Sequence, residues 1–331
     1  MELLAEYGMF VAKVLTLVIA TLIVATTLVN LVRSQRTDPG QPGELQVRHL
    51  NADLEQAALT IRSAMMPAKA LKTARKKLHS RLKRGPDESR RRIFVVDFHG
   101  DLRATALGSL RQEITAVLSV AREQDEVLVR LESGGGQVHA YGLAAAQLKR
   151  VTDREIALTV AVDKIAASGG YLMACVANRI LAAPFAIVGS IGVIAQLPNF
   201  NRLLKRHDVD FEQFMAGEHK RTVTLFGENT EAGREKFQQE IEEVHGLFKD
   251  FVKTHRPKID LDPVATGEYW YGSQAVERGL VDQLITSDEY LMKASEEAEL
   301  FQVRHAGPRP LLARLIRQGS DGLARAMESF R

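Results

Sequence analysis

The stretch Asp163-Lys-Ile-Ala-Ala-Ser168-Gly-Gly-Tyr171 separates two apolar segments and decides how the fold is interpreted. Before it, the β-branched segment Ile156–Val162 predicts a buried strand, and after it the small, apolar segment Tyr171–Asn178 predicts a buried helix. A serine at such a junction stands where a helix begins, and the free backbone N–H groups there favour negative charge. Ser168 is therefore either a nucleophile beside an oxyanion site or a residue that only caps the helix.

Strand-like and helix-like segments alternate on both sides of this stretch. Further strands are predicted at Ile93–Phe98, Val127–Leu131, Arg179–Ala182, Ile187–Ile194, Asp210–Met215 and Leu280–Leu284. Helices are predicted at Leu107–Arg122, Gly142–Arg150, Pro198–Arg206, Thr230–His255 and Ser273–Arg278. This alternation is typical of an α/β fold in which helices pack on a sheet, and it predicts a globular domain over residues 92–300.

The N-terminal residues 1–36 contain an apolar run, Val14–Val32, that carries no charge. A helix of that length is roughly 28 Å long, close to the thickness of the hydrocarbon core of a bilayer. Glu2 and Glu6 precede the run where a signal peptide would carry basic residues, so we expect a retained transmembrane anchor. Arg33 and Arg36 follow it directly, and the positive-inside rule favours a cytoplasmic location for the residues beyond.

A basic, partly helical spacer is predicted over residues 37–91, and a basic amphipathic tail over residues 301–331. The spacer includes Lys69-Ala-Leu-Lys-Thr-Ala-Arg-Lys-Lys, which suits either the anionic surface of the lipid bilayer or a solvated helix. Nucleic acid is not expected as a partner, because the run lacks interleaved aromatic residues.

Composition and motifs exclude several kinds of site. The 331 residues include one cysteine, Cys175, which excludes an intrachain disulfide and a cysteine-rich metal site. No H-E-x-x-H pattern occurs, and Gly134-Gly-Gly136 does not continue into G-x-G-x-x-G, because His139 takes the place of the third glycine. We therefore expect no metal and no cofactor. The loop Gly134–Gly136 remains a candidate for holding an oxyanion or a peptide backbone, or a simple tight turn.

A nucleophilic serine needs a base, and the residues alone leave its identity open. The scattered histidines allow a Ser-His-Asp triad, because triads are assembled in space. Lysine is the other option, provided that it is desolvated and therefore neutral. Lys220, in Gly217-Glu-His-Lys-Arg, and Lys164, close to Ser168 in sequence, are the two candidates.

The motifs, taken together, resemble one peptidase family. Asp163–Tyr171, Ala183-Pro-Phe-Ala-Ile-Val-Gly-Ser-Ile-Gly-Val, Gly217-Glu-His-Lys-Arg and Ala265-Thr-Gly-Glu-Tyr-Trp-Tyr-Gly272 occur in this order. They are similar to the signal peptide peptidase A family (S49) of serine-lysine peptidases, and most similar to its bacterial inner-membrane branch. The resemblance covers nearly the whole chain, with Gly134 where the family usually has proline.

The resemblance implies a fold, a site and a substrate class. The fold would be the ClpP/crotonase-type ββα spiral; Ser168 would be the nucleophile, Lys220 the general base, and the Gly135 amide an oxyanion donor. We add the Gly169 amide as a second donor, because it lies at a helix terminus. The enzyme would be a membrane-anchored endopeptidase of the bacterial inner membrane that cleaves extended apolar peptides, such as remnant signal peptides. It would be a ring-shaped homo-oligomer, with Ser168 and Lys220 able to come from neighbouring subunits. A non-catalytic membrane scaffold and a crotonase-like acyl-thioester enzyme are the alternatives.

Overall fold

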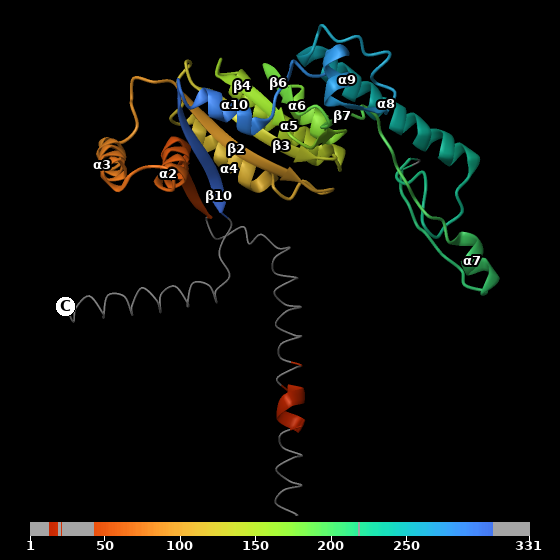
Figure 1. Cartoon of the computed structure of the whole chain (residues 1–331). Coiled ribbons are helices and arrows are strands. Elements are labelled where there is room, and N and C mark those ends of the chain that lie inside the picture. Colours follow the sequence, from red (N-terminus) through yellow and green to blue (C-terminus); the bar gives the residue numbers. More distant parts are fainter. Residues whose placement is uncertain (1–12, 19–20, 22–42, 218, 307–331) are drawn as a thin grey trace, which may run out of the picture. The chain divides into compact units, whose positions relative to one another are not determined.

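The computed structural model describes residues 13–18, 21, 43–217 and 219–306 (Figure 1). The chain divides into two compact units, residues 45–305 and the two chain ends, 1–44 with 306–331. The predicted anchor, residues 1–36, and residues 307–331 of the predicted tail lie almost entirely outside the described residues. Within the described ranges, no helix combines the length and apolarity needed to cross a membrane.

A mixed α/β architecture built on a parallel sheet organises residues 45–305. The main path of the sheet runs β1 (Glu44–His49), β10 (Glu299–Ala306), β2 (Arg92–Gly100), β3 (Glu126–Ser133), β4 (Ala157–Val162), β6 (Arg179–Ala182), β9 (Gln283–Leu284). The pairings from β10 through to β9 are all parallel. Parallel strands are covered on both faces, which explains why β3 and β4 are almost continuously apolar and buried.

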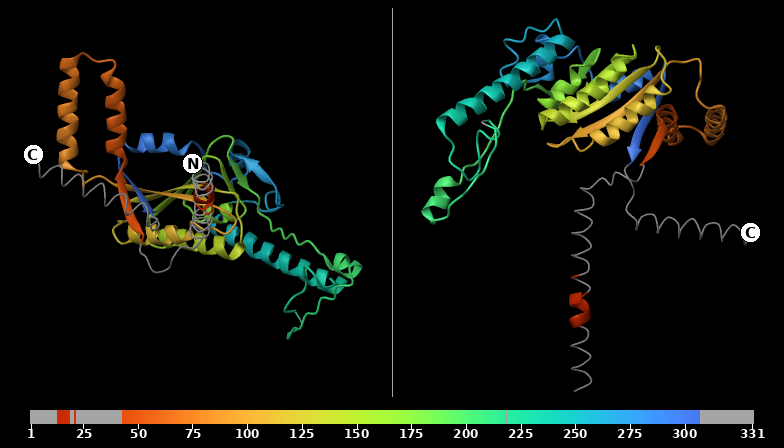
Figure 2. Two further views of the ribbon diagram at one scale, coloured as in Figure 1. Left: turned by 90° about the horizontal axis from the view of Figure 1, so that it is seen from below. Right: turned by 180° about the vertical axis from the view of Figure 1, so that it is seen from behind.

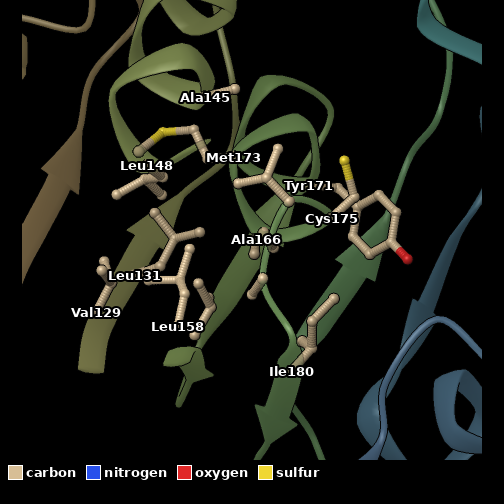
Figure 3. Packing of buried hydrophobic residues seen from close by; sticks show 14 of the residues in the cluster. Val129, Leu131, Ala145, Leu148, Leu158, Ala166, Tyr171, Met173, Cys175 and Ile180 are labelled. Atoms are coloured by element: carbon tan, nitrogen blue, oxygen red, sulfur yellow. The ribbon is translucent and has the colours of Figure 1, made fainter. Parts of the chain in front are cut away.

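Two hydrophobic cores lie on opposite faces of this sheet. On one face, α4 (Leu107–Leu118), α5 (Val138–Thr152) and α6 (Gly169–Ala174) pack on alternate strand residues. Figure 3 shows part of this core, in which Leu148 and Met173 lie over Val129 and Leu158. On the other face, Leu291 and Ala294 of α10 (Ser287–Ala294) pack with residues such as Ile93 and Leu128.

Three short strands branch from the main sheet and position the Ser168 junction. Residues 126–130 of β3 pair with β4, but Ser133 at its end pairs with Ala166 of β5 (Ile165–Ala167). β5 then pairs in parallel with β7 (Ile187–Gly189), which pairs antiparallel with β8 (Tyr269–Tyr271). The chain therefore leaves the main sheet after β4, forms β5 beside the end of β3, and enters α6 at Ser168.

Two helical features lie beside the sheet. Helices α2 (Leu50–Ser63) and α3 (Ala68–Arg84) form a hairpin, coloured orange in Figure 2. On another side, α7 (Asn201–Arg206) and its flanking chain extend away from the sheet, connected to α8 (Glu231–His255) and then α9 (Gly272–Glu277) (Figures 1 and 2). We call residues 193–230 the arm.

Most predicted elements are found, with three differences. Asp210–Met215, predicted as a strand, is exposed irregular chain, because no described strand lies beside it to share its backbone hydrogen bonds. The predicted strand Ile187–Ile194 ends at Gly189. Phe301–Ala306, expected to begin the tail, is instead the end of β10, which pairs with β2. The strands β1, β5, β8 and β10 were not predicted, because their short or charged sequences lack a clear strand pattern.

A buried carboxyl group, Glu113 on α4, links this helix to the end of β10. Its Oε1 accepts the backbone N–H of His305 at 2.7 Å, while its Oε2 is buried without a partner among the described residues. Burial raises the pKa of Glu113 to about 7 from an ordinary 4.5, although the hydrogen bond from His305 opposes the shift. The folded protein therefore favours the protonated carboxyl.

The Glu113→Gln variant should be more stable than wild type in alkaline solution only. Because the folded pKa is raised, the stability contributed by protonation is complete below about pH 4.5 and is lost as the pH rises through about 7. Glutamine keeps the acceptor for His305 and cannot ionise. We expect urea unfolding to give equal stabilities near pH 5 and a gain of about 2–3 kcal/mol for the variant near pH 8.5. A stability difference independent of pH would contradict this account of Glu113.

Candidate active site

Ser168 occupies a constrained turn between β5 and α6. Its φ of +54° lies in the left-handed region, which a residue other than glycine adopts at a cost of about 1–2 kcal/mol. The turn is held by two backbone bonds: its N–H donates to Gly189 O at 2.8 Å, and its carbonyl accepts from Leu172 N at 3.0 Å. Ser168 is the N-cap residue of α6, but its side chain makes no capping hydrogen bond, so the hydroxyl does not serve the helix as a cap. Ser168 is half-buried, and its Oγ forms no hydrogen bond with the described residues.

The loop Gly134–Gly136 lies directly against this turn. Gly135 has a φ of +89°, and a Cβ built there would lie 2.6 Å from Gly169 N and 2.8 Å from Ser168 Cβ. Only glycine permits this approach, since real Cβ contacts are never so short. The structure thus brings together three of the four predicted site residues, Gly135, Ser168 and Gly169, from two separate strand ends.

A buried polar network that no sequence motif indicated supports the loop. Tyr141 on α5 donates its hydroxyl to Asp101 O at 2.7 Å and lies 2.6 Å from Ser133 Oγ. That Ser133 Oγ in turn accepts the N–H of Gly135 at 3.1 Å. Burial raises the pKa of Tyr141, so its hydroxyl stays protonated and able to donate. The one signal in the sequence was a tyrosine among small residues on a helix that begins just after the loop.

The ring of Tyr141 also fixes the start of α6. A Cβ at Gly169 would lie 2.5 Å from Tyr141 Cγ, so this glycine is required for contact with the ring. Tyr141 is fully buried and meets Phe98 edge to face, with ring centroids 6.5 Å apart. One side chain therefore sets the positions of both the glycine loop and the residue that follows Ser168.

Lys220 shares no hydrogen bond or ion pair with the described residues of this cluster. It belongs to the arm, between α7 and α8, and its backbone N–H donates to Gly217 O at 3.2 Å. Its side chain is exposed and forms no hydrogen bond or ion pair with the described residues. The described part of the chain therefore brings the serine and the two glycine amides together without a lysine hydrogen-bonded to the serine.

Lys164, the other candidate base, is engaged elsewhere. Its Nζ donates to the two carboxylate oxygens of Glu132, at 3.1 and 3.0 Å, so its hydrogen bonds are directed away from Ser168. This pair lines a cavity of about 230 Å³ that also includes His99 and the Asp97–Arg130 ion pair. The strand residues that line it, such as Asp97 and Arg130, alternate with core residues beneath α4–α6, so the cavity lies on the other face of the sheet.

The histidines do not complete a triad within the described chain. His245 Nε2 lies 3.2 Å from Ile191 O, and His255 Nδ1 lies 2.8 Å from Phe251 O. No hydrogen bond joins a described histidine to Ser168, and the described residues include no cluster of three or more side chains suited to a metal ion.

The chain is similar to known peptidases over nearly its whole length. The family model "Peptidase family S49 N-terminal" matches residues 2–148, and "Peptidase family S49" matches residues 150–301. The chain is 44% identical to the protein named "Probable protease SohB" of Haemophilus influenzae, over 97% of this chain and 94% of that protein. A protein of the same name from Buchnera aphidicola subsp. Schlechtendalia chinensis is 44% identical, over 88% of this chain and 99% of the relative.

A solved structure also matches at low similarity. The 1510-N membrane-bound stomatin-specific protease, as a mutant in complex with a substrate peptide, is 13% identical, with a TM-score of 0.39. The match covers 70% of this chain and 99% of that one.

The chain belongs to peptidase family S49 and is a serine peptidase of the SohB type. The family resemblance found in the sequence motifs is confirmed. A non-catalytic scaffold is thereby excluded as the main function. No observation favours the other alternative, a crotonase-like enzyme that acts on acyl thioesters.

A comparison of Gly135→Ala with Gly134→Ala should distinguish the close approach that only Gly135 permits from a general need for a flexible loop. At Gly135 a methyl group would collide with Ser168 and Gly169, whereas at Gly134 its nearest neighbour is Ile165 Cδ1 at 3.7 Å, an ordinary contact. We expect labelling of Ser168 by a fluorophosphonate to slow at least about 100-fold in Gly135→Ala. Gly134→Ala should retain a rate close to wild type. Equal effects of the two substitutions would contradict the required approach at Gly135.

Proposed function

We propose that this S49 peptidase is a membrane-anchored serine endopeptidase that uses a Ser168–Lys220 dyad. The observation that carries the proposal is the approach of Gly135 to the Ser168–Gly169 turn. It leaves a half-buried hydroxyl, free of described hydrogen bonds, beside the backbone of two glycines. The amides of Gly135 and Gly169 are the donors that we assign to the oxyanion. Gly135 N–H bonds to Ser133 Oγ, so this amide must reorient toward the substrate or be shared with it.

The reaction follows from these roles. Neutral Lys220 accepts the proton of Ser168 Oγ, which attacks the peptide carbonyl carbon. The negative charge on the carbonyl oxygen is stabilised by the two amides, and the protonated lysine then donates its proton to the leaving amine. Water, deprotonated by the same lysine, attacks the carbonyl carbon of the Ser168 ester; the lysine then returns the proton to Ser168 Oγ as its bond to the acyl group breaks, which releases the second product.

The exposure of Lys220 supports assembly of the site between subunits. A lysine acts as a base only when neutral, and removal from water is what favours the neutral form. In one chain Lys220 is exposed, so a further surface must cover it. The arm that carries it exposes Phe214 by 90% and Ile194 by 79%, an apolar surface suited to a second copy. We infer that the arm of one subunit brings Lys220 to Ser168 of the next, in a closed ring.

The branched strands support the finer assignment of the fold. β4, β5 and α6 form one unit in which a strand leaves the main sheet, a short strand follows, and a helix packs back. β6 and β7 repeat the first two steps, beside the first unit. We propose that these units are turns of the ClpP/crotonase-type ββα spiral.

The surroundings of the glycine loop suit an extended apolar peptide. Leu102 and Val138 flank the loop and are 71% and 52% exposed, and Leu102 O accepts the N–H of Gln137 at 2.9 Å. A peptide lying along the loop as an added strand would place apolar side chains against these two residues. Remnant signal peptides have this chemistry. We propose Val14–Val32 as the anchor that places the enzyme in the bacterial inner membrane, near such substrates.

Three single variants test the dyad. Ser168→Ala should abolish labelling by a fluorophosphonate and cleavage of a fluorogenic apolar peptide. Lys220→Ala should lower cleavage at least about 1,000-fold, because no base remains to deprotonate the serine. Lys164→Ala is the matched control and should retain most activity, since Lys164 pairs with Glu132. Loss in Lys164→Ala with retention in Lys220→Ala would overturn the assignment of the base.

Mixed assemblies test whether the dyad spans two subunits. Ser168→Ala and Lys220→Ala chains, each inactive alone, should regain cleavage when they are co-expressed in equal amounts. One interface in four then joins an intact serine to an intact lysine, which gives about a quarter of wild-type activity. If both residues acted within one subunit, no mixed assembly would be active, while the result for Ser168→Ala alone would still stand.

A further inference from the structure

The α2–α3 hairpin is a separate surface that the peptidase reaction does not use. Leu71, Ala74 and Leu78 of α3 are half-buried, and their spacing places them on the one face that meets α2. At its base, Asn51 is buried: its Nδ2 donates to Ala298 O at 2.9 Å, and its Oδ1 accepts from Leu300 N at 2.7 Å. The hairpin is therefore attached to the sheet domain through specific hydrogen bonds.

The face of α3 turned away from α2 carries a row of lysines. Lys69, Lys72, Lys76 and Lys83 recur at helical spacing on this face, and all four are exposed. None of them forms an ion pair with a described residue. The whole helix carries Lys69, Lys72, Arg75, Lys76, Lys77, Arg81, Lys83 and Arg84, with no Asp or Glu. Of these, Arg81 pairs with Glu55 of α2.

The turn of the hairpin adds apolar side chains beside the lysines. Ile61, Met65 and Met66 are 67%, 78% and 36% exposed, and Lys69 follows them within one helical turn of Pro67. Apolar tip residues flanked by lysines match the boundary of a bilayer, where acyl chains lie next to phosphate groups. A nucleic acid would leave the apolar tip without a partner, and residues 50–84 contain no Phe, Tyr or Trp on which a base could stack.

We propose that the α2–α3 hairpin binds the surface of an anionic phospholipid bilayer. The lysine face of α3 binds lipid phosphates, and Ile61, Met65 and Met66 enter the interface. The positive charge of α3 complements the negative charge of such a surface. Because Asn51 attaches the hairpin to the sheet domain, this contact fixes how the domain faces the membrane.

A fluorophore at the hairpin tip tests the contact in the full chain. Cys175 is fully buried, so an introduced Ala64→Cys can be labelled selectively with an environment-sensitive dye. The chain is incorporated into vesicles of phosphatidylcholine alone or mixed with phosphatidylglycerol. We expect a blue shift, and quenching by brominated acyl chains, only with phosphatidylglycerol, and loss of both at high salt. A dye on Glu123→Cys, in the loop between α4 and β3, should not respond.

Charge reversal on α3 provides the decisive comparison. Lys72→Glu with Lys76→Glu should reduce the tip signal at least about ten-fold. The matched control, Lys249→Glu with Lys258→Glu, changes the net charge equally at exposed positions elsewhere and should leave the signal unchanged. Equal loss in both variants, an equal response in phosphatidylcholine alone, or an equal response at Glu123→Cys would overturn the proposal. A tip fluorophore that does not respond to vesicles but responds to a DNA duplex would also overturn the proposal.

Discussion

The approach of Gly135 to the Ser168–Gly169 turn is the constraint on which the site depends. It requires glycine at two positions, a positive φ at a serine, and strand ends held within contact distance. The pairing of Ser133 with Ala166 supplies that last condition, because it sets the ends of β3 and β5 side by side. The branch in the sheet is therefore what brings the glycine loop against the Ser168 turn.

Tyr141 makes this geometry rigid. It connects the loop after β3, through Ser133, with the chain after β2, through Asp101 O, and its ring limits the position of Gly169. A buried polar group is costly unless its hydrogen bonds are satisfied, and here both hydroxyls, of Tyr141 and Ser133, have partners. The strain at Ser168 persists because these surrounding contacts determine its backbone.

The two outlying segments of the sheet domain differ in chemistry. The arm is rich in exposed apolar residues such as Phe214, whereas α3 carries lysines and arginines without acids. Apolar surface suits a permanent contact with another protein surface, and a cationic helix suits an anionic one. The same domain thus presents two segments of different chemistry, the arm that we propose for assembly and the hairpin that we propose for the bilayer.

The sequence by itself determined the class of fold and the family. The alternation of strands and helices and the ordered motifs around Ser168 identified both, because hydrophobic period and glycine placement are local properties. It did not predict β5, β8 or β10, since strands that short or that charged are stabilised only by their neighbours in the sheet.

Only the tertiary structure decided which residues meet. It placed Gly135 against Ser168, paired Lys164 with Glu132, and introduced Tyr141, which no motif had indicated. Contacts between residues far apart in the chain depend on strand order and register, which the local pattern does not encode. The side chain of Lys220 has no hydrogen-bonded partner among the residues that the structure describes, and its segment lies in an arm that extends away from the sheet.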